Sequence, residues 1–142
     1  MSPTLARRSP VARAFTLIEL IVVIVVLAIL AGVAIPKYID YTSNAKASAT
    51  RGVLGGVRSA IANFYANSAL TGTPAWPTLV QMQTVGTVMQ EVLPNNPYLN
   101  DNSIAAAVWA ATPPTAGTNG WNFDASVGKF WSNSATSSSN TW

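Results

Sequence analysis

The strongest constraint on this chain is an apolar run, residues 15–35, that contains a single charge, Glu19. At about 1.5 Å of rise per residue, a helix over this run would be roughly 31 Å long, which matches the hydrocarbon core of a bilayer. A carboxylate within such a segment is unfavourable in lipid, so it indicates a functional residue whose partner has to be identified. The run therefore predicts a membrane-spanning helix with a functional acid near its start.

The charges on either side of the run predict its orientation. Arg7, Arg8 and Arg13 precede it, and only Lys37 follows closely. Because positive charge accumulates on the cytoplasmic side of membrane helices, we expect residues 1–14 to form a cytoplasmic leader. The chain would then cross the membrane once, with its C-terminal part outside the cytoplasm.

Composition excludes several classes of function. The 142-residue chain has no cysteine and no histidine, so it lacks disulfides, thiol chemistry and the usual general base. No phosphate-binding glycine loop or close pair of carboxylates is present, and we expect no enzymatic activity. The net charge of +3 falls to zero without the three leader arginines, since five cations then face five acids. A nucleic-acid partner is therefore not expected.

The pattern along the chain predicts an α+β fold in which one long N-terminal helix packs on a small C-terminal antiparallel sheet. Residues 15–35 would form its membrane half and 36–68 its amphipathic half, with a kink or brief break at Pro36. Residues 69–131 would form a small globular domain. The Ser/Thr/Asn-rich residues 132–142 predict a flexible tail.

Apolar residues in the second half of the helix recur at helical spacing and predict the face that packs on the sheet. This stripe consists of Val53, Val57, Ile61 and Phe64. A further helical segment is expected within 78–92. Beyond it, helical periodicity is absent.

The strongest strand signal lies near the C-terminus. Residues 121–124 and 129–132 flank a short turn that ends in Gly128, which predicts a β-hairpin. A short strand is also expected within 105–110. Trp121 and Phe123 lie on one face of the first strand and Trp131 on one face of the second, so these side chains should enter the core. The tryptophans expected to be buried are Trp121 and Trp131, and those expected at the surface are Trp76 and Trp142.

An ordinary secretory signal peptide is one alternative for the N-terminus. It would need cleavage at a small-residue site such as 32–34, although the apolar run is longer than the usual 7–15 residues. A plain signal anchor is a second alternative, which accounts for the length of the run. Neither alternative accounts for Glu19.

The segment 14–20, the apolar run after it and Pro36 resemble the N-terminus of the type IV pilin superfamily, which includes pilins and the pseudopilins of type II secretion. The resemblance implies that a prepilin peptidase cuts between Ala14 and Phe15 and that the new amine of Phe15 is methylated. The family usually has glycine before the cleavage site, so Ala14 is a departure. The resemblance assigns Glu19 to assembly, as partner of another subunit's amine, and Pro36 to adaptation of the helix outside the bilayer.

By resemblance, the chain would be a structural subunit of the major type in a type II secretion pseudopilus, which exports proteins. It would be anchored in the bacterial inner membrane with its C-terminal domain in the periplasm, and would then enter a filament in the periplasm or at the cell surface. It would polymerise with itself and other pseudopilins, and it would need the prepilin peptidase, an inner-membrane platform protein and an assembly ATPase. One alternative is a type IV pilus subunit at the cell surface, serving adhesion, motility or DNA uptake. Others are a minor filament subunit, or a membrane-anchored module that binds sugar, DNA or a secreted protein through exposed tryptophans.

A calcium site is a further expectation from the resemblance, because major pseudopilins bind calcium in a C-terminal loop. Calcium requires oxygen ligands, and the acids available in this region are Asp101 and Asp124, with Asn100 and Asn102 nearby. The alternative is that these two acids are solvated turn residues.

Overall fold

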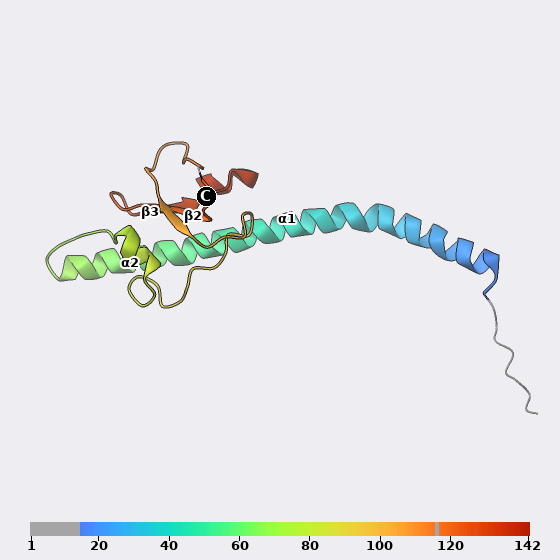
Figure 1. Ribbon diagram of the computed structural model, residues 1–142, viewed down its shortest axis with the longest axis horizontal. Helices are drawn as coiled ribbons and strands as arrows, with labels where there is room; N and C mark the ends of the chain where they lie inside the picture. Colours follow the sequence, from blue (N-terminus) through green and yellow to red (C-terminus); the bar gives the residue numbers. More distant parts are fainter. Residues whose placement is uncertain (1–14, 116) are drawn as a thin grey trace, which may run out of the picture. The chain divides into compact units, whose positions relative to one another are not determined.

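The computed structural model describes residues 15–115 and 117–142, which belong to two compact units, Met1–Asp40 and Tyr41–Trp142. Helix α1 begins in the first unit and ends in the second, and the remaining elements belong to the second (Figure 1). The predicted α+β class is confirmed. In chain order, the elements are α1 (Leu17–Leu70), α2 (Leu79–Gln83), β1 (Ile104–Ala106), β2 (Trp121–Asp124), β3 (Lys129–Ser132) and the 3-10 helix η1 (Thr136–Thr141).

Helix α1 is continuous and contains Pro36, so the brief break considered at this residue is not found. Proline has no N–H, and the carbonyl of Gly32, one turn earlier, therefore receives no bond from residue 36. A kink at this point stays a prediction. The helix extends to Leu70, slightly beyond the predicted end, and Gly72 then adopts a φ of +90° that favours glycine.

The core of the second unit forms between α1 and the sheet. Helix α1 contributes Leu54, Val57 and Ile61, which are at most 4% exposed. Two residues of the predicted stripe, Val53 and Phe64, are only half-buried, and the sequence pattern missed Leu54. Burial of each large apolar side chain contributes roughly 1.5–3 kcal/mol, so this cluster is a main source of stability. The other buried apolar residues are Met82, Leu93, Ile104, Trp121, Phe123, Phe130 and Trp131.

The sheet has the order β1-β2-β3 and is mixed, which corrects the prediction of an antiparallel sheet. Strands β2 and β3 form the predicted antiparallel hairpin, with Trp121 opposite Ser132 and Asp124 opposite Lys129. Strand β1, shorter than the predicted 105–110, instead runs parallel to β2. The long connection 107–120 makes this pairing accessible, because it carries the chain back before β2 begins.

The turn between β2 and β3 lies against Trp76. Gly128 has a φ of +65°, as expected for glycine at the exit of this turn. A Cβ atom at Gly128 would lie 2.3 Å from Cε3 of Trp76, so the turn backbone is packed directly on the indole. Tyr65 stacks on the same indole, with ring centroids 4.2 Å apart. Trp76 is thus held between α1 and the hairpin.

Helix α2 is shorter than the helical segment expected within 78–92. Its start is a capping box, in which the Thr78 side chain accepts from the N–H of Gln81 and the Gln81 side chain accepts from the N–H of Thr78. The helix ends after one turn, and Gly86 follows with a φ of +87°. A left-handed residue so soon after the helix prevents its extension.

Residues 132–142, predicted to form a flexible tail, are instead packed within the second unit. Helix η1 lies beside β3, and Ser139 and Asn140 are buried. The Asn140 amide donates to the carbonyl of Pro113 at 2.8 Å. Short polar side chains thus form hydrogen bonds with buried backbone groups here. A composition rich in Ser, Thr and Asn fits such a packed segment as well as it fits a solvated tail.

Candidate functional site

The start of α1 is organised by Thr16 and Glu19. The Glu19 carboxylate accepts from the backbone N–H of Thr16 at 2.9 Å and from its hydroxyl at 2.9 Å. The Thr16 hydroxyl in turn accepts from the backbone N–H of Glu19 at 3.2 Å. This reciprocal arrangement is a capping box, which satisfies backbone donors at the helix start. Threonine three residues before glutamate is the sequence signal for this box.

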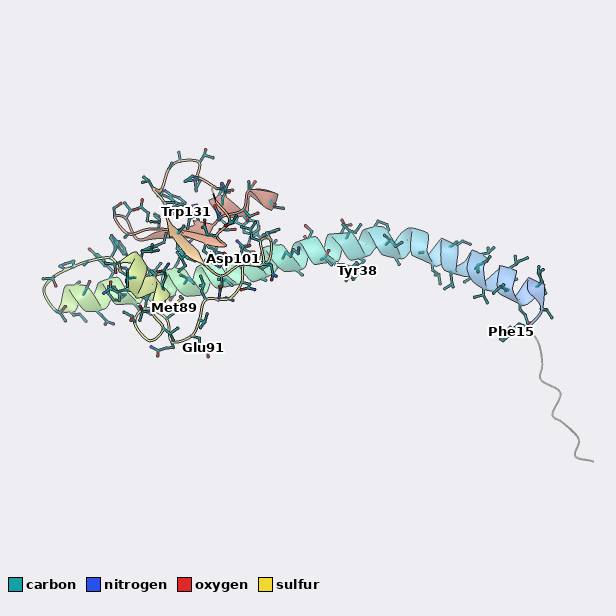
Figure 2. All side chains as sticks on the ribbon, in the orientation of Figure 1. Phe15, Tyr38, Met89, Glu91, Asp101 and Trp131 are labelled. Atoms are coloured by element: carbon teal, nitrogen blue, oxygen red, sulfur yellow. The ribbon has the colours of Figure 1, made fainter. Side chains whose placement is uncertain are left out.

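The apolar side chains of the first unit have no partner within it. Every large apolar side chain from Phe15 to Ile35 is exposed, and Phe15 itself is 89% exposed. Figure 2 displays this helix with its side chains projecting freely between the labelled Phe15 and Tyr38. Among the described residues, α1 is the one helix long and apolar enough to cross a membrane. A surface of this kind requires an apolar environment.

The other residues assigned to processing and bending lie near this segment. Ala14, on one side of the predicted cleavage site, is outside the described residues. Phe15, on the other side, directly precedes the capping residue Thr16. Pro36 lies inside α1. Cleavage and methylation at Phe15 are therefore still predictions.

Asp101 binds groups of its own neighbourhood. Its carboxylate accepts from the Ser103 hydroxyl, from the Gly120 N–H at 2.6 Å and from the Ser103 N–H at 3.2 Å. The Ser103 hydroxyl, followed by these N–H groups, lowers the pKa of Asp101 because each bond favours the charged form. A Cβ atom at Gly120 would lie 1.9 Å from the Asp101 carbonyl oxygen, so glycine permits this close approach.

Asp124 is engaged in a similar way. It accepts from the Ser126 hydroxyl at 2.5 Å, the Ser126 N–H at 2.9 Å and the Trp109 N–H at 2.8 Å. The Ser126 hydroxyl and then the Trp109 N–H lower the pKa of Asp124. Within the described residues no group of three or more acidic, histidine or cysteine side chains could hold a metal. The structure thus gives both predicted calcium ligands a role in fixing loops, and calcium binding stays untested.

The two tryptophans predicted to be buried are fully buried in the core, and both have a polar partner. The indole N–H of Trp121 donates to the Pro94 carbonyl at 3.1 Å, and that of Trp131 donates to the Pro114 carbonyl at 3.0 Å. Their role is structural. The two predicted at the surface, Trp76 and Trp142, are partly buried against this core.

A long helix with an uncovered apolar start, followed by a small α+β unit, is the layout of a pilin-like subunit. Residues 10–35 match the family model described as the prokaryotic N-terminal methylation motif. The chain is 32% identical over 107 residues to the type IV major pilin protein PilE1 of Neisseria gonorrhoeae, which covers 75% of this chain and 56% of that protein. It is 30% identical over 110 residues to the fimbrial protein EcpC of Eikenella corrodens, covering 78% of this chain and 60% of that protein.

A third relative is the type IV major fimbrial protein FimA of Dichelobacter nodosus, 34% identical over 91 residues, or 63% of this chain and 56% of that protein. The chain thus spans 56% to 60% of the length of these three relatives. No solved structure gives a significant match. The N-terminal motif and these relatives support the resemblance to the type IV pilin-like superfamily.

Proposed function

We propose that this chain is a structural subunit of a helical filament, made as a membrane-anchored precursor. The observation that carries the proposal is the uncovered apolar surface of α1 from Phe15 to Ile35, which contains one acid. Lipid would cover this surface in the precursor, and the same helices of neighbouring subunits would cover it in the filament. A head-to-tail contact of this kind does not close on itself and propagates as a filament.

Processing supplies the missing partner of Glu19. A prepilin peptidase would hydrolyse the Ala14–Phe15 bond, leaving a carboxylate on Ala14 and an amine on Phe15, and methylation retains the positive charge of that amine. The amine of an arriving subunit would then bind the Glu19 carboxylate of a subunit already in the filament. Pairing two opposite charges in an apolar core disfavours any arrangement that leaves one of them alone.

The capping box adds a step to this mechanism. Before assembly, Thr16 provides the hydrogen bonds to the Glu19 carboxylate at 2.9 Å. Assembly would either add the amine as a charged partner of Glu19 or replace one of the two bonds from Thr16 with a bond from the amine. Only the register that aligns Glu19 with an amine makes this exchange favourable, in the way that buried polar groups set the register of coiled coils.

A bend at Pro36 would help α1 to pass from the bilayer into the filament, since its backbone lacks one hydrogen bond there. The subunit would cross the inner membrane once with its leader in the cytoplasm. It would depend on the peptidase, a platform protein and an assembly ATPase. These expectations rest on the family.

The relatives are pilins and fimbrial proteins, so they favour a surface pilus over a secretion pseudopilus. The pseudopilus is the second candidate, which the small and cysteine-free second unit favours. The genes beside the coding sequence separate the two. A retraction ATPase would support the pilus, and a secretin with several pseudopilin genes would support the pseudopilus.

The test of the assembly role replaces Glu19 in the full chain, expressed with its own assembly system. We expect Glu19→Ala to insert in the membrane normally and to yield at least tenfold fewer filaments, counted by electron microscopy of sheared material. Glu91→Ala, which removes an exposed acid of the second unit, is the matched control. Mass spectrometry should identify methylated Phe15 as the mature start. Normal filament yield from Glu19→Ala, or a mature start at another residue, would refute the proposal.

A further inference from the structure

A groove of about 510 Å³ lies on the second unit, where α1, the β2–β3 turn and the C-terminal residues meet. Three indoles line it, together with two cationic side chains. These residues are Trp76, Trp109, Trp142, Arg58 and Lys129. They come from five separate parts of the sequence, so no sequence pattern could have assembled them.

The groove tryptophans differ from the core tryptophans in their hydrogen bonds. The indole N–H groups of Trp121 and Trp131 each donate to a carbonyl. Those of Trp76, Trp109 and Trp142 donate to no group among the described residues, and they are not buried. A tryptophan N–H usually has a hydrogen-bond partner when it is buried. Since these three N–H groups are accessible and have no protein partner, a ligand can accept hydrogen bonds from them.

One cation of the groove, Arg58, is held in place by the surrounding structure, and the other, Lys129, is exposed. Arg58 is half-buried and donates to the Phe130 carbonyl at 2.9 Å and to the main-chain oxygen of Trp142. The Lys129 ammonium lies 5.6 Å from the centroid of the Trp109 ring. No carboxylate side chain lines the groove. The groove therefore combines hydrogen-bond donors and positive charge with aromatic walls.

A complementary ligand must be negatively charged, rich in acceptors and apolar on one face. A sugar ring that carries a carboxylate has these properties, since its C–H face packs on indoles while its hydroxyl and carboxylate oxygens accept hydrogen bonds. A nucleic acid fits less well, because two cations cannot follow a series of phosphates. A neutral sugar would make no use of the positive charge of Lys129, whereas Arg58 is already bonded to main-chain oxygens.

We propose that this groove binds an acidic saccharide, with the sugar ring against Trp109 and its carboxylate near Lys129. The Trp142 ring is already covered by the Arg51 guanidinium, which lies 4.3 Å from its centroid, so Trp142 contributes its edge. Trp76 contributes its edge, because Tyr65 stacks on the ring and Gly128 packs against it. The inference concerns the second unit alone and does not depend on filament assembly. It adds a binding surface to each copy of the chain.

The test uses the full chain in detergent micelles and follows tryptophan fluorescence and heat of binding. Hexagalacturonate is the acidic probe, cellohexaose the neutral probe and a thymidine decanucleotide the nucleic-acid probe. We expect saturable binding of hexagalacturonate that is at least tenfold tighter than binding of either other probe. Equal or tighter binding of cellohexaose or the decanucleotide, or no saturable binding of hexagalacturonate, would overturn the proposal.

Two variants assign the binding to the groove. Lys129→Gln should weaken hexagalacturonate binding roughly twofold to fivefold, as expected for loss of one solvent-exposed ion pair. Lys46→Gln is the matched control, an exposed lysine of the same unit that does not line the groove. Trp109→Leu should reduce both the binding and the fluorescence change. If Trp109→Leu loses its near-ultraviolet circular dichroism, Lys129→Gln decides the test, and unchanged affinity in Lys129→Gln would refute the assignment.

Discussion

Asn96 offers the sharpest test of how the second unit is held together. This side chain is fully buried, and its amide donates to the Gly120 carbonyl at 2.7 Å and to the Ser132 hydroxyl at 2.8 Å. Its side-chain oxygen accepts from the Tyr98 N–H at 3.0 Å. One amide thus connects the loop before β1 with the start of β2 and the end of β3, which lie together at the open end of the hairpin.

We expect Asn96→Ala to lower the free energy of unfolding by about 3 kcal/mol. Three hydrogen bonds at about 1 kcal/mol each give this value, and the groups left unsatisfied in the core increase it. A domain of this size is stable by roughly 5–15 kcal/mol, so the loss is a large fraction of the total. For about 100 residues, it corresponds to a decrease in Tm of roughly 12–24 °C.

The measurement is thermal unfolding of the full chain in detergent, followed by near-ultraviolet circular dichroism of the core tryptophans. Asn95→Ala is the matched control, because the neighbouring side chain is exposed and makes one bond of 3.2 Å to Asn100. The control should change Tm by no more than about 2–4 °C, as surface substitutions usually stay within roughly 0.5 kcal/mol. Equal decreases in the two variants would refute the role given to Asn96.

Two further predictions concern acid stability and processing. The pKa values of Asp101 and Asp124 are lowered on folding, so both carboxylates stabilise the fold above their unfolded pKa of about 3.9, and this contribution is lost as pH falls through the folded pKa. Tm should therefore fall on acidification below about pH 4. Asp101→Asn should lower Tm at pH 7 and reduce the acid-induced fall in Tm, with Asp40→Asn as the exposed control. An acid-induced fall in Asp101→Asn equal to that of the unmodified chain would contradict this. For processing, Ala14→Gly restores the residue usual in the family and should speed cleavage at least twofold in a pulse-chase experiment, with Ala12→Gly as control; a slower rate would contradict the predicted cleavage site.

Local patterns predicted much of this fold. Helical spacing of apolar residues identified α1. The two aromatic-rich segments that flank the turn ending in Gly128 identified the β2–β3 hairpin, with Trp121 and Trp131 correctly placed in the core. These features depend on residues close in sequence.

Long-range features were missed because no short pattern encodes them. The parallel pairing of β1 with β2 depends on residues 107–120, which connect the two strands. The packing of η1 depends on bonds between distant residues, such as the one from the Asn140 amide to the Pro113 carbonyl. The residues of the N-terminal site are adjacent in sequence and could be selected from it, and their roles in processing and assembly stay predictions. The groove was not, because Arg58 and Trp142 meet only in the folded unit.

The buried polar groups of the second unit have one more consequence. Nearly all of them are amides and hydroxyls, from residues such as Asn96, Asn122, Ser132 and Ser139, and these groups do not titrate. Asp124 is the one carboxylate among the buried residues of the described chain. The interior hydrogen bonds should therefore keep their donors and acceptors from mildly acidic to alkaline surroundings. With no cysteine among its residues, the stability of the unit also does not depend on a disulfide that reducing agents could break.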